Sequence, residues 1–167
     1  MARANLRNIL RGQNLFVEGI GNIGKVGDIE TPKVEFEMAE DGNMSRKVDT
    51  GLLKPMEAKF TVYDVNPVLY KAVGKRLGDD ASFVVKASVV EGNKQKQVLF
   101  EVTGQVESQE QEGTKEAGKE AGVVFNVAVT AYRLEIDGTQ VYDIDVDRYI
   151  CKIDGKDHMD TLRKQIM

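Results

Sequence analysis

The sequence predicts a β-rich α+β fold: two packed antiparallel sheets forming a barrel-like sandwich, with one main helix and a short C-terminal helix. Several segments alternate apolar and polar residues with the period of two that is typical of half-buried strands. Asp137-Gly138 joins two such segments and is a strong hairpin signal. A helical apolar stripe follows Asn66-Pro67. With 167 residues, 41% of them hydrophobic, the chain is expected to form a single domain over residues 1–167.

The first part of the chain predicts strands separated by glycine-rich and polar connections. A basic N-terminal arm, residues 1–12, precedes a short strand over residues 14–19 and a glycine-rich turn. The next strand is expected from residue 29 to residue 38. Residues 39–54 are polar, offer few core candidates and predict a long extended loop. A half-buried strand follows over residues 56–63.

Two helices are predicted from their capping residues. Asn66 can cap the main helix, because its side chain can accept from the first free N–H groups, and Pro67 fits the first helical position. Gly78 is expected to end this helix. The C-terminal helix is expected over residues 157–167, with Asp157 as its cap.

The longest β pattern, residues 122–145, contains a fault near Ala131. Apolar residues alternate on one face up to Val129, but after Ala131 the apolar residues fall on the other face. Because side chains alternate with a period of two, the strand must bulge there or exchange one buried face for another. An ordinary bulge within one domain is the simpler interpretation. The alternative is a strand that leaves its own core for a neighbour's sheet, which makes Ala131, Tyr132 and Arg133 an inter-subunit strand switch.

Composition excludes some classes of function. The net charge of −4 argues against a sequence-independent DNA binder, which needs clustered cations. A single cysteine, Cys151, excludes an intramolecular disulfide and favours a reducing compartment. The sequence shows neither the apolar core of a signal peptide nor a stretch of membrane-spanning length, so we expect a soluble protein made inside a cell.

Three patterns have the form of functional sites but lack what the chemistry needs. Residues 19–24 match the dinucleotide pattern GxGxxG, but no helical period follows to hold a phosphate, so we interpret them as a turn. The alternating residues Asp143, Asp145 and Asp147 are typical of a calcium loop, but Arg148 occupies the position that requires glycine. We therefore expect no metal and no cofactor there.

A third pattern is the pair Cys151 and His158, which is the only cysteine–histidine combination in the chain. Cys151 lies between isoleucines in a strand-like segment, which favours a structural thiol over a nucleophile. The sequence predicts no catalytic residue and a protein that is not an enzyme.

Several short motifs occur in one order along nearly the whole chain. They are Asn14-Leu15-Phe16-Val17-Glu18-Gly19, Thr31-Pro32-Lys33, Gly51-Leu52, Met56-Glu57-Ala58-Lys59-Phe60, Tyr132-Arg133-Leu134-Glu135-Ile136-Asp137-Gly138, Val141-Tyr142-Asp143-Ile144-Asp145 and Leu162-Arg163. In this order they resemble the major tail tube proteins of contractile-tailed phages, a family shared with the tubes of R-type contractile bacteriocins.

The resemblance implies a hexameric ring whose inner strands join into one β-barrel, with rings stacked into a rigid tube inside a sheath. The tube penetrates the target envelope and, in a phage, conducts DNA without binding it specifically. The implied partners are further copies of the chain, the sheath protein, a tape-measure protein, a baseplate hub and a tail terminator, with no cofactor and no membrane anchor. The implied location is the virion tail, after synthesis and assembly in the bacterial host cytoplasm.

The resemblance also indicates candidate contact residues. Inter-ring contacts are expected at Arg3, Arg7, Asp41, Asn43, Met44, Arg46, Lys47 and Leu52. One candidate lumen face comprises Lys33, Glu35, Glu37, Glu57, Lys59 and Thr61. A second comprises Glu101, Thr103, Gln105 and Glu107. Acidic and neutral faces would let DNA pass without holding it. The sequence cannot choose between the two sets, because exterior and lumen faces are both polar.

Other functions remain open at this point. The tube of a DNA-free contractile bacteriocin or of a type VI-like system shares the implied architecture. A monomeric β-barrel ligand-binding protein is an alternative of a different class, and it predicts a monomer with an enclosed apolar cavity. An enzyme that uses Cys151 and His158 is a third alternative, and it predicts a lowered thiol pKa.

Overall fold

The computed structural model describes residues 7–22, 24–75, 78–112 and 117–167, most of which lie in antiparallel strands. The elements are β1 (Ile9–Val17), β2 (Ile20–Gly21), β3 (Val26–Glu30), β4 (Phe36–Asp41), β5 (Arg46–Leu53), β6 (Met56–Val62), the 3-10 helix η1 (Pro67–Tyr70), α1 (Lys71–Gly74), β7 (Ala81–Glu91), β8 (Lys94–Glu112), β9 (Gly122–Ile136), β10 (Thr139–Asp145), β11 (Ile150–Ile153), β12 (Lys156–Asp157) and α2 (Asp160–Ile166). The predicted β-rich α+β class with packed antiparallel layers is confirmed, and the two predicted helices are present as short helical segments.

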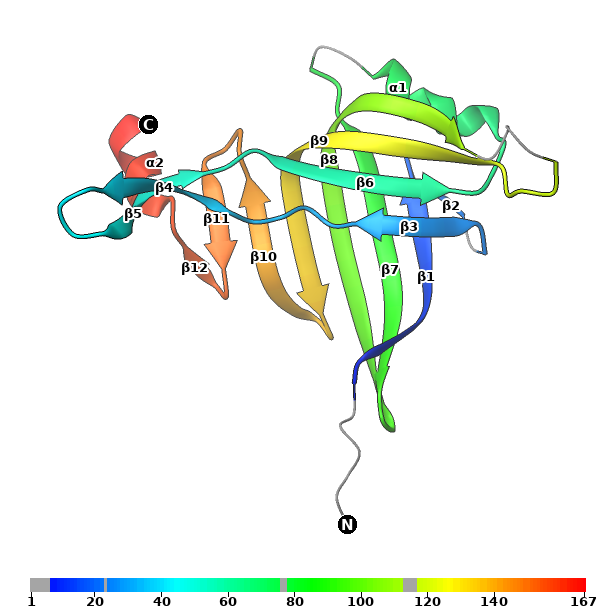
Figure 1. Ribbon diagram of the computed structural model, residues 1–167, viewed down its shortest axis with the longest axis horizontal. Coiled ribbons are helices and arrows are strands. Elements are labelled where there is room, and N and C mark those ends of the chain that lie inside the picture. Colours follow the sequence, from blue (N-terminus) through cyan, green and yellow to red (C-terminus); the bar gives the residue numbers. More distant parts are fainter. Residues whose placement is uncertain (1–6, 23, 76–77, 113–116) are drawn as a thin grey trace.

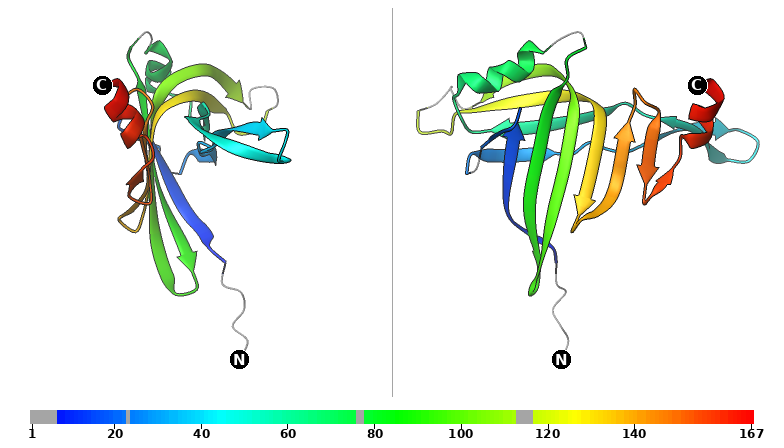
Figure 2. Two further views of the ribbon diagram at one scale, coloured as in Figure 1. Left: turned by 90° about the vertical axis from the view of Figure 1, so that its left-hand side faces the viewer. Right: turned by 180° about the vertical axis from the view of Figure 1, so that it is seen from behind.

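One ten-stranded sheet is bent so that it forms two layers. The broad layer contains β2, β1, β7, β8 up to Thr103, β9 from Ala131, and β10 to β12. The narrow layer contains β3, β6, β9 up to Val129, and β8 from Gly104. The strands of the two layers cross at a steep angle (Figures 1 and 2). Only β8 and β9 are long enough to belong to both layers.

The corner between the layers is a β-bulge at Thr130. The pairing of β8 with β9 shifts from Thr103–Ala131 to Gly104–Val129, which leaves Thr130 as the extra residue. The Thr130 hydroxyl donates to the carbonyl oxygen of Thr103 at 3.1 Å. A bulge of this kind increases the local bend of a strand, which turns β9 from one layer into the other. The fault in the alternation near Ala131 is therefore explained within one chain.

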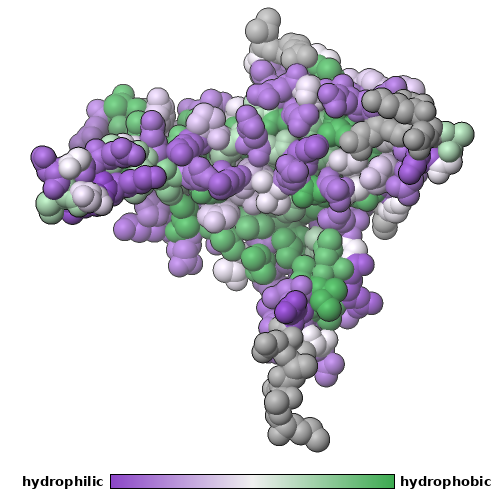
Figure 3. All heavy atoms as spheres, viewed as in Figure 1, coloured by the Kyte–Doolittle hydropathy of each residue, from purple (hydrophilic) through white to green (hydrophobic). Residues whose placement is uncertain are grey.

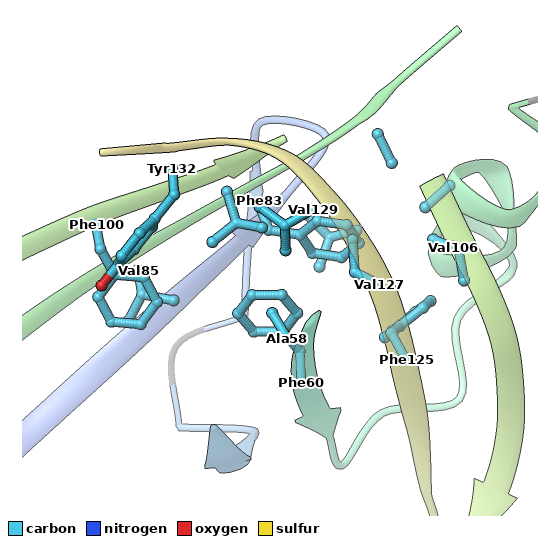
Figure 4. Packing of buried hydrophobic residues seen from close by; sticks show 14 of the residues in the cluster. Ala58, Phe60, Phe83, Val85, Phe100, Val106, Phe125, Val127, Val129 and Tyr132 are labelled. Atoms are coloured by element: carbon cyan, nitrogen blue, oxygen red, sulfur yellow. The ribbon is translucent and has the colours of Figure 1, made fainter. Parts of the chain in front are cut away.

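The hydrophobic core lies between the layers and contains aromatic side chains from both. Phe60 of the narrow layer stacks on Phe83 of the broad layer with ring centroids 4.8 Å apart, and Phe83 also meets Phe125 at 5.8 Å. All three rings are fully buried (Figure 4). Burial of one such side chain contributes about 1.5–3 kcal/mol, so these contacts hold the layers together.

Both helical segments are shorter than predicted. Asn66 caps the first as expected, because its side-chain oxygen accepts from the Val68 N–H at 3.0 Å. Regular helix ends at Gly74, before the predicted stop at Gly78. The second helix begins at Asp160 instead of Asp157, and Asp157 accepts from the Met159 N–H just before it.

The predicted strand over residues 29–38 is interrupted: residues 29–30 belong to β3 and residues 36–38 to β4. β3 ends at Glu30, and residues 31–35, which include Pro32, are irregular because proline lacks the N–H that a strand interior needs. The predicted loop over residues 39–54 is largely the β4–β5 hairpin, a separate two-stranded sheet. The hairpin projects from the body at the end occupied by α2 (Figure 1).

Candidate assembly surfaces

The narrow layer has two free edges within the described part of the chain. β3 pairs with β6 on one side, and β8 from Ser108 to Glu112 pairs with β9 on one side. Neighbouring strands are antiparallel throughout the order β3-β6-β9-β8, so the two edge strands run in opposite directions. Unpaired edges of this kind are templates for pairing with another chain.

The outer face of the narrow layer, which points away from the broad layer, is polar and mainly acidic. It contains a shallow depression of about 190 Å³ lined by the charged residues Glu30, Glu57, Lys59 and Glu107. Asn126 donates to the Ser108 hydroxyl at 2.8 Å in the middle of this face. Three carboxylates thus share the depression with one lysine, which is a surface that repels anions.

The structure brings only part of the first candidate lumen face together. Glu57 and Lys59 lie on the outer face of the narrow layer, but Thr61 is buried and does not reach solvent. Lys33 and Glu35 lie in the irregular segment at the end of this face and line a neighbouring groove of about 450 Å³ with Glu57.

Glu35 holds this groove together through ion pairs with Lys33 and with Lys54, the latter at 3.4 Å. The hydrogen bond from Lys33 lowers the pKa of Glu35 below its ordinary value, and Lys54 adds to the effect. Glu37 belongs to β4, off the narrow layer.

The corner divides the second candidate lumen face. Glu101 and Thr103 lie on the broad layer, where they line a polar depression with Arg133. Gln105 and Glu107 belong to the narrow layer. The four residues of this predicted set therefore cannot all line one channel wall. Gln105 and Glu107 share the narrow layer with Glu57 and Lys59.

Most predicted inter-ring residues are exposed on the β4–β5 hairpin. Asp41 accepts from the Asn43 N–H at 3.1 Å and pairs with Arg46 at 3.6 Å, which closes the hairpin turn. The Met44 side chain at the tip is 62% exposed, and Leu52 is exposed near the base. Lys47 is exposed on β5 as well.

The hairpin also exposes Met38 and Val48 along its length. An isolated two-stranded hairpin is marginally stable in water, and exposed apolar side chains are typical of contact sites. Its shape and composition therefore favour a docking element.

The described part of the N-terminal arm, residues 7–12, lies far from the hairpin (Figure 1). Arg7 is exposed two residues before β1. Arg3 lies outside the described residues. The arm is also shorter than predicted, because β1 begins at Ile9.

The proposed strand switch needs a correction. Residues Ala131, Tyr132 and Arg133 pair with β8 on one side and with β10 on the other, all within one chain. The Tyr132 side chain is buried in the chain's own core, and this burial raises its pKa to about 12. Since both edges are occupied, the face exchange connects two layers of the same subunit.

Cys151 and His158 anchor the hairpin and α2 against the broad layer. The Cys151 thiol is buried, and burial raises its pKa, which is the reverse of what a nucleophile needs. The His158 ring lies 6.2 Å from Phe36 at the base of the hairpin. The buried thiol and the contact between the two rings indicate that both residues contribute to packing.

Asp157 is the centre of a polar network at the same place. It accepts from the N–H groups of Met159 and Cys151, and from Arg163 at 2.8 Å. Burial alone raises the pKa of this carboxyl group, but the hydrogen bonds together outweigh it and hold the pKa below the ordinary value. Sequence spacing identified Asp157 only as a helix cap, because its partners come from both β11 and the start of α2.

The remaining motif candidates fall in turns and on strand surfaces. Gly19 and Gly24 have positive φ values, +82° and +76°, in the turns around β2, and the strand β3 follows them. Over the residues that the structure describes, no three histidine, cysteine, aspartate or glutamate side chains form a metal-binding group. Within the same residues, neither helix has the length and apolar character needed to cross a membrane.

Comparisons with known proteins agree with this architecture. A family model described as phage tail tube protein FII matches residues 7–166. Among solved structures, the chain is similar to Hcp1 from Flavobacterium johnsoniae, with a TM-score of 0.51 and 11% sequence identity over 77% of this chain and 96% of that chain. At this identity the similarity concerns the fold alone. The comparison with curated proteins gives no match.

Proposed function

Since the chain belongs to the family of phage tail tube protein FII and is a structural subunit of a tail tube, we propose that its narrow layer builds the channel wall. The observation that carries this proposal is the pair of free edges on β3 and β8. Closing a sheet through such edges into a barrel removes exposed edges that would otherwise aggregate.

The strand directions suit a closed ring of identical subunits. Rotation places β8 of one copy beside β3 of the next, and because these strands run in opposite directions, the new pair is antiparallel like all the others. A head-to-tail interface that closes by rotation gives a ring. The hexamer implied by the sequence resemblance then contains one continuous barrel.

The outer face of the narrow layer is proposed to line the channel. Its depression carries Glu30, Glu57 and Glu107 with Lys59 as the one cation. Fixed cations bind DNA by displacing counterions from its phosphates, whereas carboxylates repel it. This face therefore suits a conduit through which DNA passes without adhering.

The hairpin and the N-terminal arm are proposed to join rings into a tube. In a ring closed through β3 and β8, the strands of the narrow layer run between one ring and the next, and the hairpin projects in the same direction (Figure 1). Asp41, Asn43, Met44, Arg46, Lys47 and Leu52 are the contact residues on the hairpin, and Arg7 is the contact residue on the described part of the arm.

The other partners follow from position in such a tube. The sheath protein contacts the outside, a tape-measure protein occupies the channel, and the baseplate hub and tail terminator meet its two ends. The protein is then a component of the virion tail, assembled in the host cytoplasm.

Cross-linking tests the proposed ring. Glu30 on β3 is replaced by cysteine together with Gln105, Glu107, Ser108 or Glu110 on β8, one pair at a time. Within one chain these strands are about 14 Å apart, three strand spacings, so a disulfide forms only between subunits. One register should give a ladder ending at the hexamer, and electron microscopy should show rings or tubes. A chain that stays monomeric at all concentrations and salt conditions contradicts the proposal.

A further inference from the structure

The inner face of the broad layer extends past the narrow layer and remains uncovered. Its exposed part, here called the open apolar face, lies below β3 in the view of Figure 3, where apolar residues gather. It consists of Leu10, Val98, Leu134, Ile136, Tyr142 and Ile153. Ile136 is 37% exposed and Leu10 is more exposed still.

The strand register makes these residues one continuous surface. Val98 pairs with Ile136, and Leu134 pairs with Tyr142, which in turn pairs with Ile153. The row that contains Leu134 begins at Leu15 and Phe100, both of which are buried in the core. The open apolar face is therefore core-type surface without a cover, which is typical of a contact site.

A helical segment, residues 65–74, packs beside β8 on the core-facing side of the narrow layer. Tyr70 in this segment accepts a hydrogen bond from Gln111 of β8 at 2.8 Å. Leu69 and Ala72 are buried beneath it, but Val65 and Tyr70 expose 71% and 42% of their surface. In Figure 1 the helices of this segment lie above the narrow layer, whereas the parts of β8, β9 and β10 that carry most of the open apolar face lie below it, so the segment does not cover that face of its own chain.

We propose that the open apolar face binds the helical segment 65–74 of the neighbouring copy in the ring. The inference rests on the proposed pairing of β8 with β3 of the next subunit. In that pairing, β8 of the neighbour continues the narrow layer past β3, in front of the open apolar face. Because the hydrogen bond between Tyr70 and Gln111 attaches the helical segment to β8, the neighbour's segment is placed together with the neighbour's β8. It then fills the space between the extended narrow layer and the open apolar face.

This arrangement removes two exposed apolar surfaces with one contact. Val65 and Tyr70 leave water on one copy, and Ile136 and its neighbours leave water on the other. It also explains why the broad layer is wider than the narrow layer of its own chain. The missing part of the inner layer is supplied by the adjacent subunit.

Cross-linking within assembled rings tests this contact. Tyr70 and Ile136 are both replaced by cysteine, and Cys151 is kept because it is buried. Within one chain these positions are far apart, because Gln111 and Val98, their respective partners, are separated by about 40 Å along β8. Mild oxidation should therefore give a ladder of linked subunits. The matched control pairs Tyr70→Cys with Glu135→Cys, the next residue on β9, whose side chain points to the opposite face.

The outcomes separate this inference from the proposed function. If rings form normally and the two cysteine pairs link equally well, the helical contact is wrong but the proposed ring stands. The same holds if rings form and neither pair links. Absence of any ring overturns both proposals.

A second variant, Ile136→Lys, should raise the concentration needed for ring formation at least tenfold while leaving the melting temperature of the monomer unchanged. Normal ring formation by this variant overturns the inference, since a buried lysine is costly at such a contact.

Discussion

A side-chain carbon on Gly104 would lie 2.0 Å from the carbonyl oxygen of Ala128, so the corner between β8 and β9 tolerates only glycine. This close approach is possible because Thr130 bulges out of the ladder directly beside it. The two long strands can therefore change layers together. This corner folds one sheet into the two layers that enclose the core.

The first prediction concerns this corner. Gly104→Ala should lower the free energy of unfolding by about 3 kcal/mol, because the added carbon displaces backbone in a packed interior. Urea unfolding measures the change. Gly12→Ala in β1 is the matched control, since nothing lies within 4 Å of its added carbon, and it should change stability by less than about 0.5 kcal/mol. Equal effects of the two substitutions would contradict this account of the corner.

Much of this corner was predictable from the sequence. The switch of apolar residues around Ala131 indicated a bulge, because a period of two cannot change phase without an extra residue. The sequence did not show which strand meets β9 there. The switch therefore also fitted an exchange between subunits, until the pairing with β8 and β10 placed both halves in one chain.

The candidate lumen face was less predictable for a related reason. Alternation placed Glu37 and Glu57 on polar faces correctly, but it does not show which strands are neighbours in the sheet. The irregular segment after β3 moves Glu37 to the hairpin. Thr61 is buried although it alternates with Glu57 and Lys59, because burial at the strand end depends on segments distant in sequence.

The second prediction concerns pH. The pKa of Asp157 is lower in the folded chain than its ordinary value of 3.8, so the stability it contributes is present above that pH and is lost as pH falls through the folded pKa. Asp157→Asn should therefore lower the melting temperature at pH 7, and the difference from the unaltered chain should shrink towards pH 2–3. Calorimetry across this range measures it. A difference that is constant with pH would show that the carboxylate charge is irrelevant.

The third prediction concerns the thiol. Cys151 is buried and its pKa is raised, so iodoacetamide at pH 7 should modify it only when the chain is unfolded. Mass spectrometry with and without denaturant measures the modification. Met44→Cys supplies the control, because the hairpin tip is exposed and its thiol should react within the native protein. Rapid modification of Cys151 in the folded protein would show that the thiol is accessible and reactive, which its burial argues against.

The fourth prediction concerns the hairpin. Replacing residues 41–46 with Asn-Gly joins the paired residues Glu40 and Lys47 through a two-residue turn and removes the exposed Met44. Because the base of the hairpin stays packed through Phe36 and Leu53, the melting temperature should not change. Rings should form but fail to stack, so electron microscopy should show single rings where the unaltered chain gives tubes. Met44→Leu keeps an apolar tip and should still form tubes, whereas tubes from the shortened hairpin would exclude its tip from contacts between rings.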